Sequence, residues 1–345
     1  MADAPMMVDT AKPEDPQKRI FQFAYIRSFA CMAIVLLHTV NSARVYHAGT
    51  ISASQQAGAF AACSALMWAV PCFLMVTGAL LLDRQKKVTR QKLFKYIKRV
   101  VIALVIFTAV FTVIRHDPAS ETGIVREFFD GLLRNHCMAY LWYLYLMIAL
   151  YLLMPLFKAM TDRLSDRQLT VLLCAVLTVC SVLPLASYLG IEAALYIPTW
   201  TVYGAYLFMG HLLYRHRMDA RLAAVIFVVC TVLLPFLTMR AADAGLDPAG
   251  FTGYNSPLVV TQSAAVYSLM LGLSKKPGAF IENTDRCSFG IYLIHMIFIR
   301  LTMKEMGLDL FAYGPAAFAA ASAVYFIAAF AVTYLLKKFR VFSFL

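Results

Sequence analysis

Charged residues are scarce in this sequence, and that scarcity excludes an ordinary water-soluble domain. Asp, Glu, Lys and Arg make up 14% of the 345 residues and hydrophobic residues make up 61%, whereas a soluble domain carries about 25% charged residues. The formal net charge of +12 would fit a nucleic-acid binder, but the basic residues fall in alternate gaps between apolar runs. That distribution is typical of membrane topology and needs no anionic partner.

Paired cysteines and carboxylates within apolar runs are also missing. No CxxC pair occurs among the eight cysteines, so the sequence indicates neither a metal knuckle nor a redox motif, and we expect no metal. Most of the cysteines lie inside apolar runs, where a thiol packs as a small apolar side chain. No Asp or Glu lies deep within an apolar run, which disfavours a carboxylate proton relay or an ion-coupled transport path.

Ten apolar runs are each long enough to cross a bilayer. They predict an all-α, polytopic membrane helix bundle that forms one membrane domain over residues 20–345. Residues 1–19 are polar and lack the apolar core of a signal peptide, so we expect a short cytoplasmic tail there. Because the last run ends close to residue 345, we expect no appended extracytoplasmic domain. The runs cover residues 21–43, 58–82, 96–114, 139–157, 169–189, 196–214, 220–239, 257–273, 287–303 and 314–336.

The orientation of the bundle follows from the basic residues between the runs. With the N-terminus inside, 23 Lys and Arg residues fall in cytoplasmic segments and seven in outer segments, so the positive-inside rule predicts that both termini are cytoplasmic. Of the outer segments, Val125–Leu133 is a short amphipathic pattern that we expect in the membrane interface. The small-residue loop 240–256 contains Asn255 and is expected to help form an entrance from outside.

The first run carries the two residues best suited to chemistry. Arg27 and His38 are eleven residues apart, which on a helix is about 16 Å of rise and nearly the same face. His38 is a candidate general base because histidine titrates near neutral pH, and Arg27 is a candidate anchor for an anionic group from the cytoplasm. The alternatives are a buried histidine that links helices and an arginine that extends to the headgroups.

Other polar and aromatic residues in the runs have two interpretations each, one structural and one as a substrate contact. His295, the second intramembrane histidine, is either a polar contact between helices or a substrate contact. Trp142, Tyr143 and Tyr145 lie near the outer end of the fourth run. There they form either an aromatic belt or the lining of a sugar-binding mouth.

Residues 84–99 form the densest basic cluster of the chain. A topogenic cytoplasmic loop is enough to explain this cluster. Arg90, Lys92, Lys98 and Arg99 would also suit the phosphates of a polyphosphorylated cofactor, because guanidinium and ammonium groups bind phosphate well.

Five motifs of this chain resemble those of the acyltransferase-3 family of integral-membrane acyltransferases. Arg27 and His38, separated by ten residues, resemble the R-x10-H signature of the family's first span. One departure is visible, because many members have a histidine where this chain has Tyr140. The other four motifs are VPCFLMVTGALLL at 70–82, LWYLYLMIALYLLMP at 141–155, GYNSPLVV at 253–260 and SFGIYLIH at 288–295.

The resemblance implies a membrane O-acyltransferase of the bacterial cytoplasmic membrane. Such an enzyme moves an acetyl group from acetyl-CoA to a hydroxyl of a surface or lipid-linked glycan at the outer face. His38 and Arg27 would then be catalytic, with Arg90, Lys92, Lys98 and Arg99 at the phosphates of the donor. The acceptor would contact Trp142, Tyr143, Tyr145, Asn255 and His295.

Two other functions remain open on the sequence alone. A glycan or lipid-linked saccharide transporter or flippase also needs a central polar cavity, although the apolar runs offer no carboxylate for ion coupling. A haem protein with His38 and His295 as axial ligands is the third reading, which purified protein without a haem absorption band would exclude.

Overall fold

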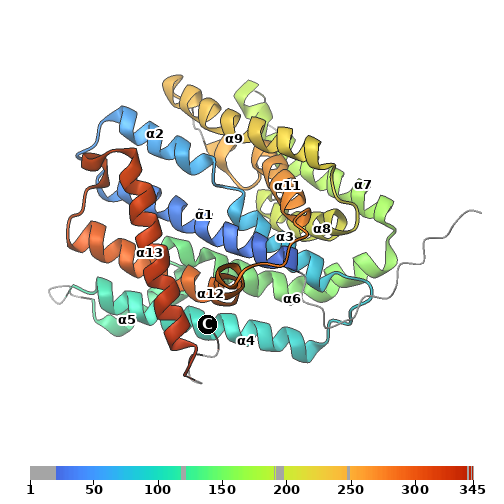
Figure 1. Ribbon diagram of the computed structural model, residues 1–345, viewed down its shortest axis with the longest axis horizontal. Helices are drawn as coiled ribbons and strands as arrows, with labels where there is room; N and C mark the ends of the chain where they lie inside the picture. Colours follow the sequence, from blue (N-terminus) through green and yellow to red (C-terminus); the bar gives the residue numbers. More distant parts are fainter. Residues whose placement is uncertain are drawn as a thin grey trace, which may run out of the picture.

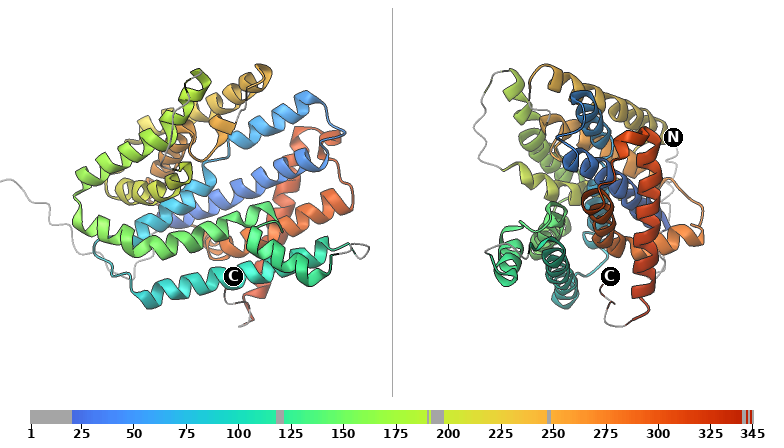
Figure 2. Two further views of the ribbon diagram at one scale, coloured as in Figure 1. Left: turned by 180° about the vertical axis from the view of Figure 1, so that it is seen from behind. Right: turned by 90° about the vertical axis from the view of Figure 1, so that its left-hand side faces the viewer.

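The computed structural model describes residues 21–117, 122–189, 191, 198–246, 249–339, 342 and 344. The predicted cytoplasmic tail, residues 1–19, lies outside the described residues. The described part of the chain is built of helices and contains no strand, which confirms the predicted fold class. Figures 1 and 2 show the helices as a bundle, with α9 and α2 along one edge and α4 along the opposite edge.

Helix α1 (Phe21–Tyr46) is the central element of the bundle (Figure 1). It packs against α2, α3, α11, α12 and α13, and its buried residues are mostly small or apolar, including Ala24, Ala30 and Ala33. Small side chains let neighbouring helices approach closely where no hydrophobic effect drives them together, as in a membrane. Arg27 and His38 are therefore placed among several other helices.

The second predicted span, 58–82, is two helices rather than one. Helix α2 (Ala53–Ser64) and helix α3 (Ala69–Leu81) are separated by a turn. A break inside a membrane leaves backbone groups that need hydrogen-bond partners. The Gln262 side-chain amide meets one of these needs, because its Nε2 atom donates to the Ala65 carbonyl at 3.1 Å.

Helix α4 (Arg90–Arg115) begins inside the basic cluster, so residues 90–99 are helical and do not form a loop. The Thr89 side chain caps this helix by accepting from the backbone N–H of Lys92, and Lys, Arg and Gln are good helix formers. Helix α5 (Ile124–Arg134) confirms that the short amphipathic pattern is helical, and Val125, Phe129 and Leu133 form an exposed apolar stripe on it.

Each of the remaining predicted runs contains a helix, but the helices differ in length. Eight described helices, or helices joined end to end, are long and apolar enough to cross a membrane. The sixth and eighth predicted spans correspond to α8 and α11, which are shorter than these eight. The helices of the last seven runs are α6 (Trp142–Arg163), α7 (Asp166–Leu177), α8 (Val202–Arg215), α9 (Ala220–Asp243), α11 (Pro257–Leu271), α12 (Ala279–Arg300) and α13 (Pro315–Leu336).

Segments that the basic residues assign to the cytoplasmic side meet in the structure. Asp166 pairs with Arg84 at 2.8 Å and with Arg215 at 2.9 Å, and the Lys337 ammonium donates to the Arg286 carbonyl at 2.6 Å. The contacts therefore group these segments as the prediction does. That this end faces the cytoplasm stays a prediction from the distribution of charge.

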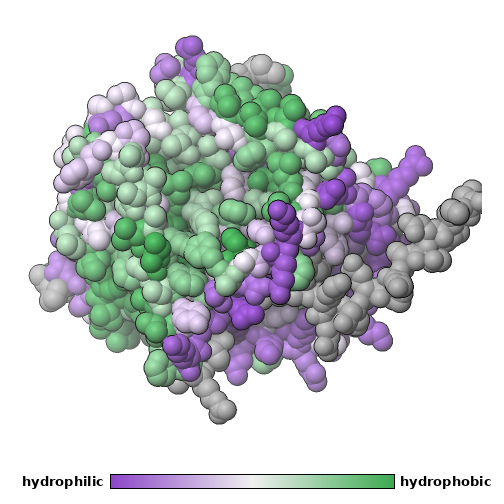
Figure 3. Space-filling view, viewed as in Figure 1, coloured by the Kyte–Doolittle hydropathy of each residue, from purple (hydrophilic) through white to green (hydrophobic). Residues whose placement is uncertain are grey.

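The surface of the helix bundle carries the exposed apolar side chains expected of a protein in lipid. Val225, Val228, Val229 and Val232 on α9 are each more than half exposed. Figure 3 shows hydrophobic residues over most of the face in view and hydrophilic residues gathered toward its lower right. Exposed apolar patches of this extent mark membrane or protein contact surfaces.

Candidate active site

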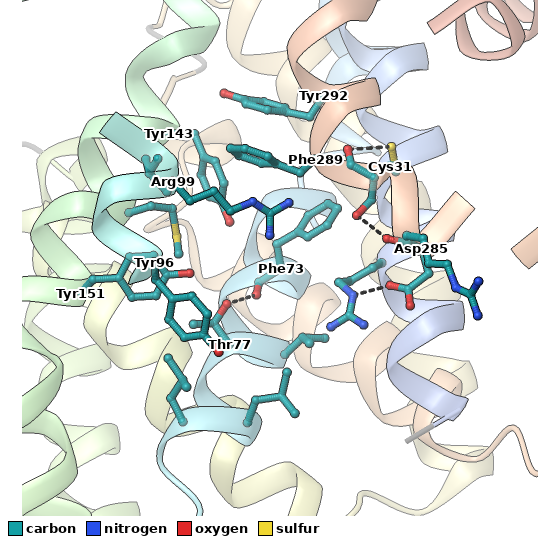
Figure 4. Close-up of a pocket in the computed structure, with 18 of the residues that line it drawn as sticks. Cys31, Phe73, Thr77, Tyr96, Arg99, Tyr143, Tyr151, Asp285, Phe289 and Tyr292 are labelled. Carbon is teal, nitrogen blue, oxygen red and sulfur yellow. Dashed lines mark hydrogen bonds and ion pairs between the residues drawn. The ribbon is translucent and has the colours of Figure 1, made fainter. Parts of the chain in front are cut away.

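A cavity of about 890 Å³ lies between α1, α3, α4, α6 and α12 (Figure 4). Its volume falls in the upper part of the range of small-molecule sites, which run from about 300 to 1,000 Å³. Helix α1 contributes Arg27, Cys31 and Ile34 to its wall, and α6 contributes Tyr143 and Met147. Charged, aromatic and aliphatic side chains thus share one space.

Basic side chains dominate the polar part of this cavity. They stand close enough to repel one another, and burial together with the charges of Arg99 and Arg286 lowers the pKa of Lys337. Among the lining residues, Asp285 is the one carboxylate. An anionic ligand would relieve the excess positive charge. The basic residues that line the cavity are Arg27, Lys86, Lys87, Lys92, Arg99, Arg286 and Lys337.

Arg27 is held by Asp285 on the facing helix α12. Its Nε atom donates to Oδ1 of Asp285 at 2.5 Å, and the carboxylate side chain is 2% exposed. The Arg27 side chain makes no other hydrogen bond to the described residues. Its two terminal nitrogens therefore remain available at the cavity wall. Asp285 thereby orients Arg27 as well as compensating its charge.

Arg99 reaches into the cavity from α4, as Figure 4 shows. Its guanidinium carbon lies 4.7 Å from the centroid of the Phe289 ring, a cation–π geometry. Its Nε atom donates to the Phe344 carbonyl at 2.5 Å. These contacts fix the side chain of Arg99 in the cavity wall.

On each of three helices, the residues that line the cavity follow one helix face. The residue that continues each of these three rows beyond the cavity contacts the other two. On α1 the stripe Arg27, Cys31 and Ile34 continues to His38. On α12 the stripe Asp285, Ser288 and Tyr292 continues to His295, and on α6 the stripe Tyr151, Met147 and Tyr143 leads back to Tyr140 in the 3₁₀ turn Ala139–Leu141 before α6. Residues three or four apart share a helix face. His38, His295 and Tyr140 therefore lie together directly beyond the end of the cavity that Tyr143 and Tyr292 form.

The rings of this cluster are in contact. The His38 and His295 centroids are 5.3 Å apart, and the Tyr140 ring lies 6.1 Å from His38 and 5.8 Å from His295. Tyr292 lies between the cavity and the cluster, with its ring 5.5 Å from Tyr140 and 5.6 Å from Tyr143. Tyr143 and Tyr292 form the end of the cavity nearest the histidines. They thus separate the cavity from His38 by one layer of side chains.

The polar groups around the two histidines are largely committed. The Tyr140 hydroxyl donates to the Leu293 carbonyl at 2.8 Å, and the Tyr292 hydroxyl donates to the Tyr140 carbonyl. His295 is 0% exposed, whereas His38 keeps part of its side chain accessible and does not line the cavity. Of the two histidines, His38 is thus the one with accessible surface.

The other aromatic and polar candidates lie in three different places. The Trp142 ring contacts Tyr203 and Tyr254, both at 5.5 Å between centroids. The Tyr145 hydroxyl donates to the Leu132 carbonyl near α5, and the Asn255 amide donates to the Cys180 carbonyl. Trp142 thus belongs to an aromatic group of its own, while Tyr145 and Asn255 make structural contacts.

Some of the basic candidates lie outside the cavity. Lys92 and Arg99 line it, whereas Arg90 and Lys98 are exposed and do not. Sequence reasoning did not single out Asp285, because it stands two positions before the run that begins at residue 287. The detectable signal was that acidic residues, Asp285 and Glu305, adjoin the two ends of this run, since an arginine in a span pairs with a buried partner in most cases.

A family model described as an acyltransferase domain matches residues 20–338. No curated protein and no solved structure matches the chain. The match covers nearly the whole chain and includes Arg27, His38 and the helices that build the cavity. The chain therefore belongs to the acyltransferase-3 family and is a multi-pass membrane acyltransferase.

Proposed function

We propose that this protein transfers an acetyl group from cytoplasmic acetyl-CoA to a hydroxyl of a surface or lipid-linked glycan at the outer face of a bacterial cytoplasmic membrane. The observation that carries the proposal is the arrangement of the cavity. It is rich in basic side chains and it ends at Tyr143 and Tyr292, and the Tyr292 ring contacts His295, which in turn contacts His38. A charged group and a reactive group at opposite ends of one ligand fit this shape.

Acetyl-CoA has the chemistry that such a cavity requires. Its phosphates are strong acceptors for Lys and Arg, and Lys86, Lys87 and Lys92 provide such donors. Its uncharged arm would pass the apolar wall formed by residues such as Ile34 and Phe73. The thioester would then lie at the tyrosines beside His38, with the terminal nitrogens of Arg27 available to anionic or carbonyl oxygens of the donor.

In the reaction we propose, His38 acts as the general base. It takes the proton of the acceptor hydroxyl as the hydroxyl oxygen forms its bond to the thioester carbon. The carbon–sulfur bond then breaks, and the proton passes from His38 to the departing thiolate. The products are an O-acetylated glycan and free CoA thiol, and His38 returns to its neutral form.

The acceptor would approach His38 from the side opposite the donor cavity. His38 keeps accessible surface although it does not line that cavity. Trp142, Tyr203 and Tyr254 form an aromatic group next to Tyr143. Flat aromatic faces suit the apolar faces of sugar rings, and their polar edges suit sugar hydroxyls.

Mass spectrometry of surface glycans from strains with and without the gene tests this proposal. We expect acetyl groups on one glycan to disappear while its sugar backbone remains at the surface. Purified protein in detergent should transfer label from acetyl-CoA to that glycan. Loss of the whole glycan from the surface, with no donor turnover, would contradict acyl transfer and support transport of the saccharide.

Donor binding predicts a difference among the four basic candidates of the cluster. Lys92→Gln and Arg99→Gln should raise the KM for acetyl-CoA about tenfold, with a smaller effect on kcat, because phosphate contacts far from the thioester contribute uniform binding. Arg90→Gln and Lys98→Gln are the matched controls, since both residues are exposed and lie outside the cavity. Equal KM values in all four variants would leave these residues a topogenic role only.

Arg27→Lys is expected to lower kcat/KM about 10- to 100-fold although it keeps the charge. One ammonium cannot both pair with Asp285 and present two further nitrogens to the donor, and a hydrogen bond to a charged group contributes about 1.5–3 kcal/mol. Arg27→Leu is less informative, because a buried carboxylate without its partner costs about 3–5 kcal/mol of stability. A lysine variant with the kcat/KM of the wild type would show that only the charge of Arg27 matters.

A further inference from the structure

One nitrogen of His295 has no hydrogen-bond partner among the described residues. The ring is 0% exposed, and its Nε2 atom is buried without a hydrogen bond among the described residues. Buried polar atoms are nearly always paired, and an exception calls for a physical explanation. The position of this atom, beside the proposed general base, makes the explanation a functional matter.

The protonation of the His295 ring follows from its other nitrogen. Nδ1 lies 3.0 Å from the backbone carbonyl oxygen of Ile291. A carbonyl oxygen only accepts hydrogen bonds, so Nδ1 must carry a proton in this contact. In the neutral ring the lone pair is then on Nε2, which is an acceptor in need of a donor.

Three rings contact His295 within the described part of the chain, and only one has a free donor to offer. They belong to Tyr140, Tyr292 and His38. The hydroxyl protons of both tyrosines are already donated to backbone carbonyls. The His38 ring makes no hydrogen bond to the described residues, and its centroid lies 5.3 Å from that of His295, a separation at which a nitrogen of each ring can face the other at hydrogen-bond distance.

We propose that His295 is the positioning residue of His38, accepting the N–H of one His38 nitrogen at its Nε2 atom. The inference rests on the proposed function, because it assigns His38 as the general base. With one His38 nitrogen donating to His295, the other nitrogen is unprotonated and faces the acceptor hydroxyl. That second nitrogen takes the proton of the hydroxyl and gives it to the departing thiolate, while the proton shared with His295 stays on His38 throughout.

The backbone explains why a neutral histidine serves this purpose here. The bond from Nδ1 to the carbonyl four residues earlier on α12 fixes the ring against its own helix. No carboxylate is in contact with the His38 ring among the described residues, and Asp285 is paired with Arg27. A neutral acceptor holds the tautomer of His38 without placing a permanent negative charge inside the membrane, which would be costly.

The test compares His295→Leu with His295→Gln. The leucine removes the acceptor, and we expect kcat to fall about 100-fold, the size of effect that misplacing a reacting group by about 1 Å produces. The KM for acetyl-CoA should stay within twofold, because His295 does not line the cavity. In the glutamine variant the amide oxygen can accept from His38, so kcat should recover at least tenfold relative to leucine.

His211→Leu is the matched control for loss of a buried histidine. His211 lies on α8, is 2% exposed, and also has an unpartnered Nε2 atom in the described structure, but no ring of the described residues contacts it. Its replacement should change melting temperature without changing kcat of the folded fraction. Similar losses of kcat in the His295→Leu and His211→Leu proteins, or no recovery with glutamine in a folded protein, would overturn the proposal.

A measurement without turnover separates this inference from the proposed function. Nitrogen-15 NMR of histidine-labelled protein in detergent, with the His38 signal assigned from its absence in His38→Ala, reports the tautomer of His38. We expect one tautomer in the wild type and a mixture in His295→Leu. A mixture in the wild type would overturn the positioning role even if acetyl transfer is established, and one tautomer would support it even if the acceptor is not a glycan.

Discussion

His38→Ala is expected to lower the rate of acyl transfer by about 10²- to 10⁴-fold, the usual contribution of a positioned general base. The same variant should still bind acetyl-CoA with an affinity near that of the wild type, because His38 does not line the donor cavity. Its melting temperature should fall only modestly, since the partly exposed His38 side chain would lose one neutral hydrogen bond, the one proposed to His295, worth about 0.5–1.5 kcal/mol. Turnover, donor binding and melting temperature are measured on one preparation.

The three measurements separate catalysis from packing. A histidine that served only to hold helices together would lower stability when removed and leave the folded fraction active. His136→Ala is the control, because that histidine is largely exposed and its neighbour is Asp130 on α5, away from the cavity lining. A His38→Ala enzyme that turns over at the rate of the wild type would exclude His38 as the base and direct attention to His295.

The sequence predicted the parts of the site that depend on a single helix. The spacing of Arg27 and His38 placed both on one face of α1, and Cys31 and Ile34 between them line the cavity on that face. Helical periodicity is a local property that needs no knowledge of neighbours. The apolar runs likewise predicted where helices lie, because the thickness of a bilayer sets the length of a span.

Pairings between helices were beyond such reasoning. Arg27 and Asp285 are 258 positions apart in the chain, and the local sequence of neither residue predicts that the two side chains pair. The same holds for His38 and His295, which became a pair only when α1 and α12 packed side by side. The division of the basic cluster into lining and exposed residues depended on the unexpected helical start of α4.

The break between α2 and α3 was missed for a related reason. Residues 58–82 are apolar throughout, so their composition predicts one continuous span. The turn is stabilised by Gln262, a residue of α11, and not by a proline or glycine within the turn itself. Pro71 in the first turn of α3 was the local signal for the break, because a proline disfavours a helix that continues through the turn before it.

The second large effect is a loss of stability that we expect where α3 and α8 cross in close contact. Glycines on α3 and α8 lie where the two backbones touch: a Cβ atom on Gly78 would lie 1.9 Å from the Leu207 carbonyl oxygen, and one on Gly210 would lie 2.1 Å from the Met75 carbonyl oxygen. Backbone atoms cannot move aside as a flexible side chain can. The two helices would have to separate along their whole contact.

Gly78→Ala and Gly210→Ala are each expected to destabilise the protein by more than about 4 kcal/mol, the size reserved for overpacking of a rigid core. Because α3 also carries Phe73 and Thr77 of the cavity wall, any protein that still folds should bind acetyl-CoA weakly. The measurements are the yield of monodisperse protein in detergent, its melting temperature and its donor affinity.

Gly58→Ala on α2 is the matched control for these two variants. A Cβ atom at Gly58 would meet nothing within 4 Å, so alanine should leave stability unchanged or raise it by about 0.5–1 kcal/mol through its better helix propensity. If Gly78→Ala melted as Gly58→Ala does, α3 and α8 could not be in backbone contact.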